Sequence, residues 1–539
     1  MHAEHAFALA VVAATVSSAL LGGEGAQAAV EVVVSGPPGA RVSKLLFGQM
    51  MERANWAGEI GAELAWDAEK GTWRAGFLEL MEELRPTCLR FPGGKLADYR
   101  DWRDFIDNVP GRVGPRPPEP GQGGTTISRN VGVDEFLRLC QRIGSEPILV
   151  VNVGQFVNSG RIAEGARLAA DWVEYCNAKN DGSNPGGGVD WAAVRAKNGH
   201  PEPYGVRLWQ LGNEAFGWLP RGREELYGKA CAEYVKAMKA VDPSIEIIAE
   251  GHSPAFRQAT LAAIGDDVDY LCVHAYGPWR ITQTGLSLDE AWRGYVSLSL
   301  AGGMQGFFRA AQELREKPLG HIKLALTEWN WNGFWRLPPG HRPPPLGAYA
   351  RALGAMTFFH DVLRRADVCE IACVSMLVGH GWGITTLRAP RDPQKPIYPF
   401  PSFEFFTMYR RNTGDRLLNV EVRGAPTYDV TKPLGTIRTA KGLSCLDVVA
   451  TVDERFVYVA AINRHLRQAL RATVRLNGCG VRPAGEAEIV WIAGDPETEH
   501  TPDNPRAIRR QRARARYRNS VLEHTFPPRS ATILKFPVR

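Results

Sequence analysis

The sequence predicts an α/β protein, a (β/α)8 TIM barrel followed by a C-terminal antiparallel β-sandwich. Between positions 45 and 379, eight short apolar runs alternate with amphipathic segments of helical period, which is the pattern of a parallel barrel. After position 402 this pattern gives way to short β-rich runs separated by turn residues, which is typical of a sandwich. The 539 residues suffice for a barrel of about 250 residues and smaller units.

The barrel strands are predicted from the apolar runs. Runs rich in Val, Ile and Leu are typical of strands buried on both faces of a parallel sheet. They lie at residues 45–52, 88–94, 146–154, 208–214, 245–251, 270–276, 323–330 and 371–379. Segments of helical period fill the gaps, at residues 74–84, 133–143, 161–177, 223–241, 288–317 and 346–366. The later β-rich runs include residues 447–452, 456–462, 488–492 and 531–536.

The N-terminus resembles a signal peptide. An apolar stretch at residues 7–21, too short to span a bilayer, precedes the small-residue sequence Ala26-Gln27-Ala28, which is typical of a cleavage site. We therefore expect a secreted or periplasmic protein with no membrane insertion after cleavage. The alternative is an unstructured or mis-started N-terminus, because Glu4 is present and Lys and Arg are absent from this segment.

The predicted elements divide the chain into four parts. The division follows the change of pattern along the sequence. The parts are residues 1–28 as the signal peptide, 29–44 as an N-terminal strand that joins the sandwich, 45–400 as the barrel, and 401–539 as the sandwich.

Composition excludes several classes of protein. Contents of 44% hydrophobic and 23% charged residues are those of a soluble globular protein. The formal net charge of +6 is small for this length, which argues against a dedicated nucleic-acid binder. The nine cysteines are an odd number, and most lie inside predicted elements, which favours buried free thiols. Cys369 and Cys373 are four apart, but no second Cys/His pair lies near enough to indicate zinc.

A basic run near the C-terminus, at residues 506–518, holds seven arginines. Tyr517 is its one aromatic residue, so binding of single-stranded nucleic acid is a weak interpretation. A solvated loop or a strand edge of the sandwich is favoured, and contact with an acidic polysaccharide is the functional alternative. We therefore expect no nucleic-acid partner.

Two of the apolar runs end in a glutamate. Glu214 closes the fourth predicted strand, and Glu328 lies near the end of the seventh. The carboxyl ends of the strands carry the chemistry of a TIM barrel, so both side chains are expected in one cleft. Two carboxyl groups are the minimum needed to cleave a glycosidic bond: one donates a proton to the leaving oxygen, and the other attacks or stabilises the sugar carbon. The alternative for each glutamate is a surface carboxylate at a strand end.

The neighbours of these glutamates suit a sugar. Asn213 precedes the first, and its amide can hydrogen-bond a sugar 2-hydroxyl, a contact that strengthens in the transition state. Trp329 and Trp331 flank the second, and we expect them to form a stacking floor for the sugar ring.

Several longer motifs give the chain a specific resemblance, because they occur in family order over most of its length. It resembles the family 51 glycoside hydrolases, the α-L-arabinofuranosidases, which are retaining enzymes with a barrel and a C-terminal β-sandwich. The motifs are FGQMMER, LRFPGG, DWVEYCN, NGHPEPYGVRLWQLGNE, VHAYG, TEWNWNG and FPPRSATIL.

The resemblance implies roles for individual residues. Glu214 would be the acid/base and Glu328 the nucleophile, with no metal or organic cofactor. Glu52 would bind sugar hydroxyls, its alternative being an ion pair with Arg90 or Arg53.

The resemblance also implies roles for residues near the sixth predicted strand. Tyr276 would hydrogen-bond the nucleophile and hold it ionised. His274 lies two positions earlier on the same strand face, and Trp279 is a plausible stacking wall. The alternatives are a satisfied core histidine, a packed tyrosine and a packed tryptophan.

Two positions depart from the family pattern. After the Pro-Gly-Gly turn the family commonly places an asparagine that touches the substrate, and this chain has Lys95. At the end of the eighth predicted strand a family glutamine is replaced by a stretch that begins with Met376. Lys95 can meet a uronate carboxylate, or it is a solvent-facing or ion-paired lysine.

The sequence therefore predicts a retaining α-L-arabinofuranosidase that releases terminal arabinofuranose from a plant-type polysaccharide or oligosaccharide. The carbohydrate is the expected partner, with a homo-oligomer as a further possibility. One alternative is a glycosidase of the same clan with another specificity, either a β-glycosidase or an enzyme for uronate-containing chains. Another is a non-catalytic carbohydrate-binding protein, against which the presence of both glutamates argues.

Overall fold

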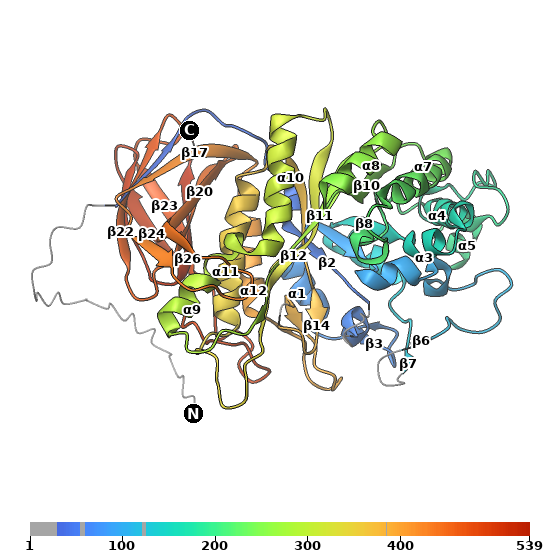
Figure 1. Cartoon of the computed structure of the whole chain (residues 1–539), viewed down its shortest axis with the longest axis horizontal. Coiled ribbons are helices and arrows are strands. Elements are labelled where there is room, and N and C mark those ends of the chain that lie inside the picture. The colour runs from blue at the N-terminus through green and yellow to red at the C-terminus, as the bar shows by residue number, and fades with distance from the viewer. Residues whose placement is uncertain (1–29, 54–59, 121–125, 384, 539) are drawn as a thin grey trace, which may run out of the picture.

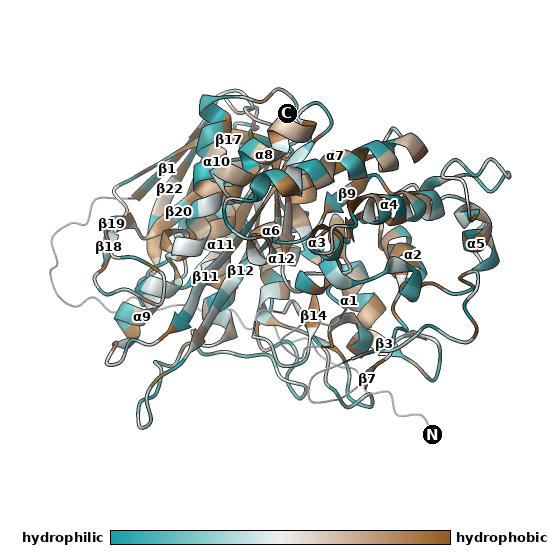
Figure 2. Ribbon diagram, turned by 45° about the vertical axis from the view of Figure 1, so that its right-hand side comes forward, coloured by the Kyte–Doolittle hydropathy of each residue, from teal (hydrophilic) through white to brown (hydrophobic). Residues whose placement is uncertain are grey.

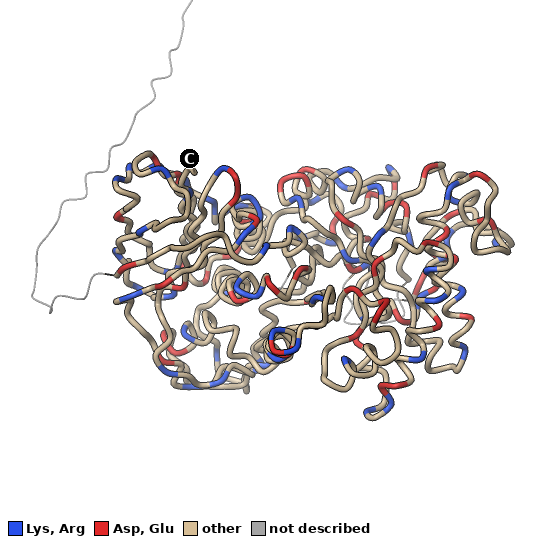
Figure 3. Tube along the Cα trace, turned by 90° about the horizontal axis from the view of Figure 1, so that it is seen from above, with Lys and Arg blue, Asp and Glu red and all other residues tan. Residues whose placement is uncertain are grey.

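The computed structural model describes residues 30–53, 60–120, 126–383 and 385–538, and the predicted signal peptide lies outside them. A barrel with its helices and a β-rich C-terminal part lie side by side along the long axis (Figure 1). Acidic and basic residues are interspersed over both (Figure 3), in keeping with the small net charge. Within the described residues, no helix has the length and apolar character that a membrane crossing requires.

Eight parallel strands close into the predicted barrel, which confirms the fold class. The first strand is shorter than expected, because Ser43 caps a 3-10 turn at Lys44–Phe47 that takes up its beginning. The eight strands are β2 (Gly48–Met50), β5 (Cys88–Phe91), β8 (Glu146–Val151), β9 (Leu208–Leu211), β10 (Glu246–Glu250), β11 (Tyr270–Ile281), β12 (Lys323–Trp335) and β13 (Cys369–Val374).

Helices surround the barrel and bury one face against it. Along α4 and α7 hydrophobic and hydrophilic residues alternate (Figure 2), as a helix that is buried on one side requires. The helices are α1 (Phe77–Leu84), α2 (Val133–Ile143), α3 (Gly154–Asn158), α4 (Ile162–Asn177), α5 (Trp191–Lys197), α6 (Ala215–Trp218), α7 (Glu224–Val241), α8 (Pro254–Ile264), α9 (Leu288–Tyr295), α10 (Gln305–Glu316), α11 (Ala348–Leu363) and α12 (Pro401–Arg411).

The helix expected at residues 288–317 is interrupted, and α9 and α10 are its two halves. Between them the chain passes against β11, where a Cβ on Gly303 would lie 2.0 Å from the carbonyl oxygen of Tyr276. The close approach requires glycine, and it ends the regular helix there.

The C-terminal part is built on a nine-stranded sheet in the order β24-β23-β26-β21-β20-β17-β1-β22-β25. The strand that comes first in the sequence, β1 (Val30–Ser35), pairs antiparallel with β17 and parallel with β22. The sheet is therefore mixed at this one place rather than antiparallel throughout. The other strands are β17 (Arg416–Arg423), β20 (Leu446–Val452), β21 (Phe456–Asn463), β22 (Leu470–Asn477), β23 (Gly485–Ala493), β24 (Gln511–Tyr517), β25 (Val521–Phe526) and β26 (Ser530–Pro537).

All nine cysteines are buried free thiols.

Short strand pairs complete the described structure. These pairs lie in connections outside the two main sheets. They are β3 (Trp66–Asp67) with β4 (Thr72–Trp73), β6 (Glu119–Pro120) with β7 (Thr126–Ile127), β18 (Thr427–Val430) with β19 (Ala440–Ser444), and the set β14 (Val378–Gly379), β15 (Leu387–Arg388) and β16 (Tyr398–Pro399).

A buried charge cluster joins the barrel to the sheet. Asp447 on β20 accepts from His360 Nδ1 at 3.1 Å and from Arg464 at 2.7 Å, and it also pairs with Arg364 beyond the end of α11. His360 Nε2 in turn lies 2.7 Å from the hydroxyl of Tyr409 on α12. Burial raises the pKa of Asp447, but Arg464, Arg364 and His360 outweigh it and hold that pKa well below its usual range.

We expect Asp447→Asn to lower the free energy of unfolding by about 3 kcal/mol at neutral pH, because Arg464 loses its paired carboxylate and Arg364 keeps only Asp361. Since the folded pKa is depressed, this contribution is complete above the unfolded value of about 4 and is lost as the pH falls through the folded value. Urea unfolding at several pH values measures it. Asp503→Asn, at an exposed loop position, is the control. A loss as small as that of the control would show that the cluster does not stabilise the junction.

Candidate active site

Glu214 lies just beyond the carboxyl end of β9 in an unusual backbone conformation. Its φ of +49° is left-handed, and it precedes the short helix α6. A non-glycine residue in this region is strained by about 1–3 kcal/mol, and such strain is concentrated at functional sites. The conformation leaves the Glu214 side chain 33% exposed at the mouth of the barrel, where a ligand can reach it.

Glu328 owes its direction to a β-bulge in β12. In the pairing with β11, Val273 is opposite Leu326 but His274 is opposite Glu328, so Thr327 is the extra residue. A bulge re-aims the side chains that follow it. Here it brings Glu328 beside His274, while Thr327 Oγ1 lies 3.0 Å from Nε2 of the same imidazole.

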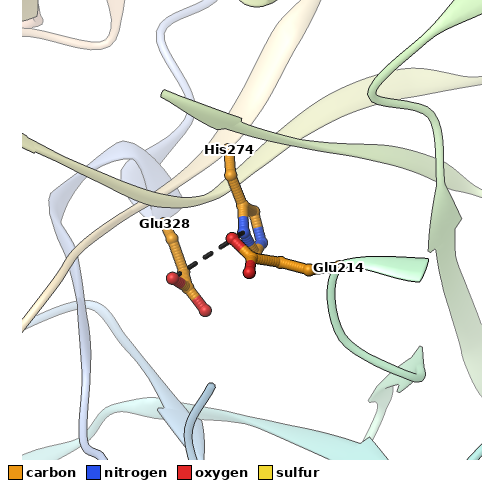
Figure 4. Close-up of side chains that lie close together, drawn as sticks. All are labelled: Glu214, His274 and Glu328. Atoms are coloured by element: carbon orange, nitrogen blue, oxygen red, sulfur yellow. Dashed lines mark hydrogen bonds and ion pairs between the residues drawn. The ribbon is translucent and has the colours of Figure 1, made fainter. Parts of the chain in front are cut away.

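The two glutamates meet across His274, as Figure 4 shows. His274 Nδ1 lies 2.9 Å from Glu214 Oε1 and 3.7 Å from Glu328 Oε2. One oxygen of each glutamate and one imidazole nitrogen lie within 4.8 Å of one another. Burial lowers the pKa of His274, but the carboxylates of Glu328 and Glu214 outweigh it and raise the pKa above its ordinary value. The structure thus brings the predicted pair together at one site.

Glu328 is held as an anion. Arg90 Nη1 donates to Glu328 Oε1 at 2.7 Å, and the Tyr276 hydroxyl donates to Oε2 at 2.7 Å. Burial raises the pKa of Glu328, but His274, Arg90 and Tyr276 together lower it below its ordinary value. An ionised carboxylate with both oxygens oriented is suited to nucleophilic attack.

Arg90 also positions Asn213. Its Nη2 donates to Asn213 Oδ1 at 2.6 Å and its Nε to Gln210 Oε1 at 2.7 Å. Since Oδ1 is occupied in this way, Nδ2 of Asn213 is the remaining donor group of the amide, and it is buried without a protein partner. An unsatisfied buried donor beside two carboxylates is suited to a ligand hydroxyl.

Glu52 lies close to the same cleft. Its Oε1 accepts from the N–H of Gly94 at 3.2 Å, and a Cβ on Gly94 would lie 3.6 Å from Glu328 Oε1. The alternative ion pairs are not the ones that form: Arg90 pairs with Glu328, and Arg53 pairs with Glu63 and Glu119. The Gly-Gly turn therefore places Glu52 beside Glu328.

Lys95 and Met376, the two departures, differ in exposure. Lys95 begins a 3-10 turn at Lys95–Tyr99 directly after Gly94, is exposed, and forms no ion pair with the described residues. Met376 is 1% exposed. The departure at position 95 therefore puts an exposed lysine directly after Gly94, whereas the departure at 376 puts an apolar side chain in the protein interior.

Of the three tryptophans that were expected to contact the sugar, one is exposed and two are buried. Trp279 is 42% exposed and its ring centre lies 5.7 Å from that of Tyr276, so it can face a sugar. The expectation that Trp329 and Trp331 form a stacking floor is wrong, because both are buried. Trp329 stacks on Phe359 of α11 at 5.7 Å. Beyond the bulge, residues that alternate with Glu328 point outward to the helices.

Glu250 is a site residue that the sequence argument missed. It ends β10, and its carboxylate accepts from the N–H of Ala215 at 3.2 Å and of His252 at 2.8 Å. Burial raises its pKa to about 7, against the opposing charge of His274. By holding the backbone next to Glu214, it positions that side chain. The signal was available, since residues 245–251 are another apolar run that contains a strand-end glutamate.

Asp98 supports the other side of the same turn. It accepts from the N–H of Asn213 at 2.8 Å and from Trp218 Nε1 at 2.9 Å, and also from two backbone N–H groups at the start of α3. Burial raises its pKa to about 6, although these hydrogen bonds oppose the shift. Its partners are far away in the sequence, so no local pattern could reveal it.

The cluster of Glu214, His274 and Glu328 also has the spacing of a metal site. Arg90 and Tyr276 already donate to the two oxygens of Glu328, and His274 Nδ1 is hydrogen-bonded to Glu214. Positive charge is thus supplied by protein groups, and the arrangement suits proton transfer and nucleophilic attack.

Comparisons with known proteins agree with this geometry. The family model "Alpha-L-arabinofuranosidase 1 domain" matches residues 80–289, and "Alpha-L-arabinofuranosidase C-terminal domain" matches residues 328–530. The chain is 34% identical to alpha-L-arabinofuranosidase C of Emericella nidulans, over 85% of this chain and 88% of that protein. It is 29% identical to an intracellular exo-alpha-(1->5)-L-arabinofuranosidase of Halalkalibacterium halodurans, over 75% and 78%.

The fold is shared with solved structures. The arabinose complex of the alpha-L-arabinofuranosidase from Thermotoga maritima superposes with a TM-score of 0.73 at 23% identity, over 94% of this chain and 100% of that one. The GH51 enzyme from Thermotoga petrophila gives the same TM-score and identity, over 94% and 99%.

The predicted secreted or periplasmic location is wrong by these comparisons. The relatives from H. halodurans, Acetivibrio thermocellus, Streptomyces lividans and Bacillus subtilis all bear the name intracellular, which points to a location inside the cell. An apolar N-terminal stretch without a basic residue was weak ground for export.

The resemblance predicted from the motifs is confirmed. Because the chain has a 34% identical relative over most of its length, it belongs to the α-L-arabinofuranosidases of glycoside hydrolase family 51.

Proposed function

We propose that this protein is a retaining exo-acting α-L-arabinofuranosidase with Glu214 as acid/base and Glu328 as nucleophile. The observation that carries the proposal is that one oxygen of each carboxyl group lies within 4.8 Å of the other. Retaining glycosidases have their two carboxyl groups about 5–5.5 Å apart, whereas inverting ones need about 6.5–9.5 Å to admit a water molecule. The short separation therefore supports retention.

The reaction follows from the two environments. Glu328, ionised between Arg90 and Tyr276, attacks the anomeric carbon while Glu214 donates its proton to the glycosidic oxygen. The leaving group departs as an alcohol and a glycosyl–Glu328 ester remains. Glu214, now a carboxylate, takes a proton from water, which displaces Glu328 and releases the sugar with its original configuration.

Asn213 contributes to the transition state. Its buried and unpartnered Nδ2 is available to a sugar 2-hydroxyl, and Arg90 fixes the orientation of the amide. A hydrogen bond to this hydroxyl strengthens as the oxocarbenium-like transition state forms. Exo action on terminal arabinofuranose is supported by the names of the relatives, several of which are exo-alpha-(1->5) enzymes.

Other parts of the proposal rest on the sequence. Glu52, His274 and Trp279 remain proposed substrate-binding residues, and a homo-oligomer remains a prediction that light scattering can check. The boundaries 45–400 for the barrel and 401–539 for the sandwich are likewise proposed.

The roles of the two glutamates are separable with aryl α-L-arabinofuranosides. Glu328→Ala is expected to abolish turnover of every substrate, because no ester can form. Glu214→Ala is expected to spare the first step for substrates with good leaving groups, and added azide should restore the second step. The product configuration, followed by NMR, should be retained by the wild type.

Glu246→Gln is the matched control, since it removes a carboxylate at the opposite end of β10. Near-native activity of Glu328→Ala would refute the nucleophile assignment. Circular dichroism and thermal unfolding of each variant distinguish lost chemistry from a lost fold.

Tyr276→Phe should change the pH profile of kcat/KM. Without this donor the pKa of Glu328 rises, so the acidic limb, where activity falls as the nucleophile becomes protonated, should move to higher pH. The lost hydrogen bond to a charged group is expected to lower kcat/KM about 10- to 100-fold. Tyr270→Phe, on the same strand but at its far end, should leave the limb in place. An unmoved limb in Tyr276→Phe would mean that the tyrosine does not control Glu328.

A second candidate, a same-family enzyme for a substrate with a carboxylate near the scissile sugar, is favoured by the exposed Lys95. Lys95→Asn should then raise activity on the plain aryl arabinofuranoside and lower it on the uronate-bearing substrate. Lys44→Asn, far from the cleft in the turn before β2, is a control for the loss of charge. If the substrate profile of Lys95→Asn matches the wild type, the plain arabinofuranoside activity stands.

A further inference from the structure

A cavity of about 700 Å³ lies between the C-terminal end of α12 and the strands β23, β24 and β26 of the C-terminal sheet. Glu488 is the one carboxylate among the described residues that line it. Its cationic lining residues are Arg411, Arg510, Arg512, Arg514 and Lys535.

The arginine run of the sequence builds one wall of this cavity. In β24 and just before it, arginines occur at every second position, which places them on the same face of the sheet. Across the neighbouring strands, Arg514 is opposite Glu488, and Glu488 is opposite Lys535. The expectation of a strand edge is thus correct for this part of the run, but its side chains line a cavity as well as facing solvent.

Most of these cations already have a counter-charge. Arg510 pairs with Glu83 and Glu404, and Lys535 lies 2.9 Å from Glu488. Arg514 Nη1 lies 3.3 Å from Glu486.

Two arginines of the cavity form no ion pair with the described residues, although Glu83 and Glu488 lie close enough to act on them electrostatically. Arg411 donates to the backbone carbonyl of Glu83 at 2.6 Å, and Arg512 forms no ion pair. Burial lowers the pKa of Arg411, and the neighbouring Arg510 and Arg512 lower it further, against the opposing charge of Glu83. Like charges gathered around an open cavity favour an anionic ligand.

The cavity is at the end of the barrel opposite the catalytic pair. Arg411 ends α12 and contacts Glu83 in the last turn of α1, and α1 leads into the beginning of β5. Glu214 and Glu328 instead lie at or near the carboxyl ends of their strands. A ligand here does not reach the reacting sugar.

We propose that this cavity is a second binding site, one that takes a small multivalent oxyanion through Arg411 and Arg512. Guanidinium groups bind carboxylate and phosphate groups through paired hydrogen bonds, and the volume is that of a small-molecule site. No aromatic side chain is among the lining residues, so a neutral sugar has no stacking surface there. The anionic groups can come from a free phosphate compound or from the uronates of a short acidic glycan.

Calorimetric titration of the full chain tests the site with inorganic pyrophosphate, digalacturonate and a neutral disaccharide. The anions are expected to bind, more weakly as the NaCl concentration rises, and the neutral sugar is not. The double variant R411Q/R512Q should weaken anion binding at least about tenfold, because two charged hydrogen-bond donors are lost. Whichever anion binds more tightly identifies the source of the ligand.

Arg516→Gln is the matched control, since it removes the same charge from the same strand outside the cavity. It should change the Kd less than about twofold. Absence of binding to wild type, or equal weakening by the control, would overturn the proposal. So would competition between the anion and an aryl arabinofuranoside, which would place the anion in the catalytic cleft. A change in oligomeric mass of the double variant would assign the cavity to contact between copies and also overturn it.

Discussion

The ion pair between Arg90 and Glu328 is the interaction on which the site depends. Burying a guanidinium costs free energy unless its N–H groups form hydrogen bonds. Arg90 is fully buried, and it donates to Glu328, Gln210 and Asn213. One side chain of β5 therefore connects the ends of β9 and β12. It keeps Glu328 charged and also fixes the orientation of the Asn213 amide, so electrostatics and orientation have a common origin.

The backbone departs from regular geometry where this chemistry is placed. Glu214 has a left-handed conformation, and β12 gains an extra residue at Thr327. Glu250 and Asp98 accept hydrogen bonds from the backbone on either side of Glu214, and so hold a turn that would otherwise relax. The regular barrel supplies rigidity, and these irregularities aim two carboxylates that regular strands would not bring together.

The barrel and its pair of glutamates at strand ends could be predicted because their signals are local. Val- and Leu-rich runs identify buried strands, and a glutamate at the end of such a run lies on a known face. Trp329 was misplaced because neighbouring residues of a strand point to opposite faces, so it turns away from the side that Glu328 faces. Arg90 was visible inside a buried strand, but its partner is 238 positions away. Asp98 likewise accepts hydrogen bonds from backbone groups that are distant in the sequence. Glu250, by contrast, ends an apolar run as Glu214 does, so the same pattern could have identified it.

The position of β1 has a consequence for the chain as a whole. This strand lies inside the C-terminal sheet, between β17 and β22, although the entire barrel separates it from them in sequence. The barrel is thus an insertion within the sheet rather than a domain that precedes it. A fragment that began after β1 would expose facing rows of unpaired N–H and C=O groups on β17 and β22. The chain therefore enters the barrel from one strand of the C-terminal sheet, β1, and returns to the same sheet after the barrel is complete.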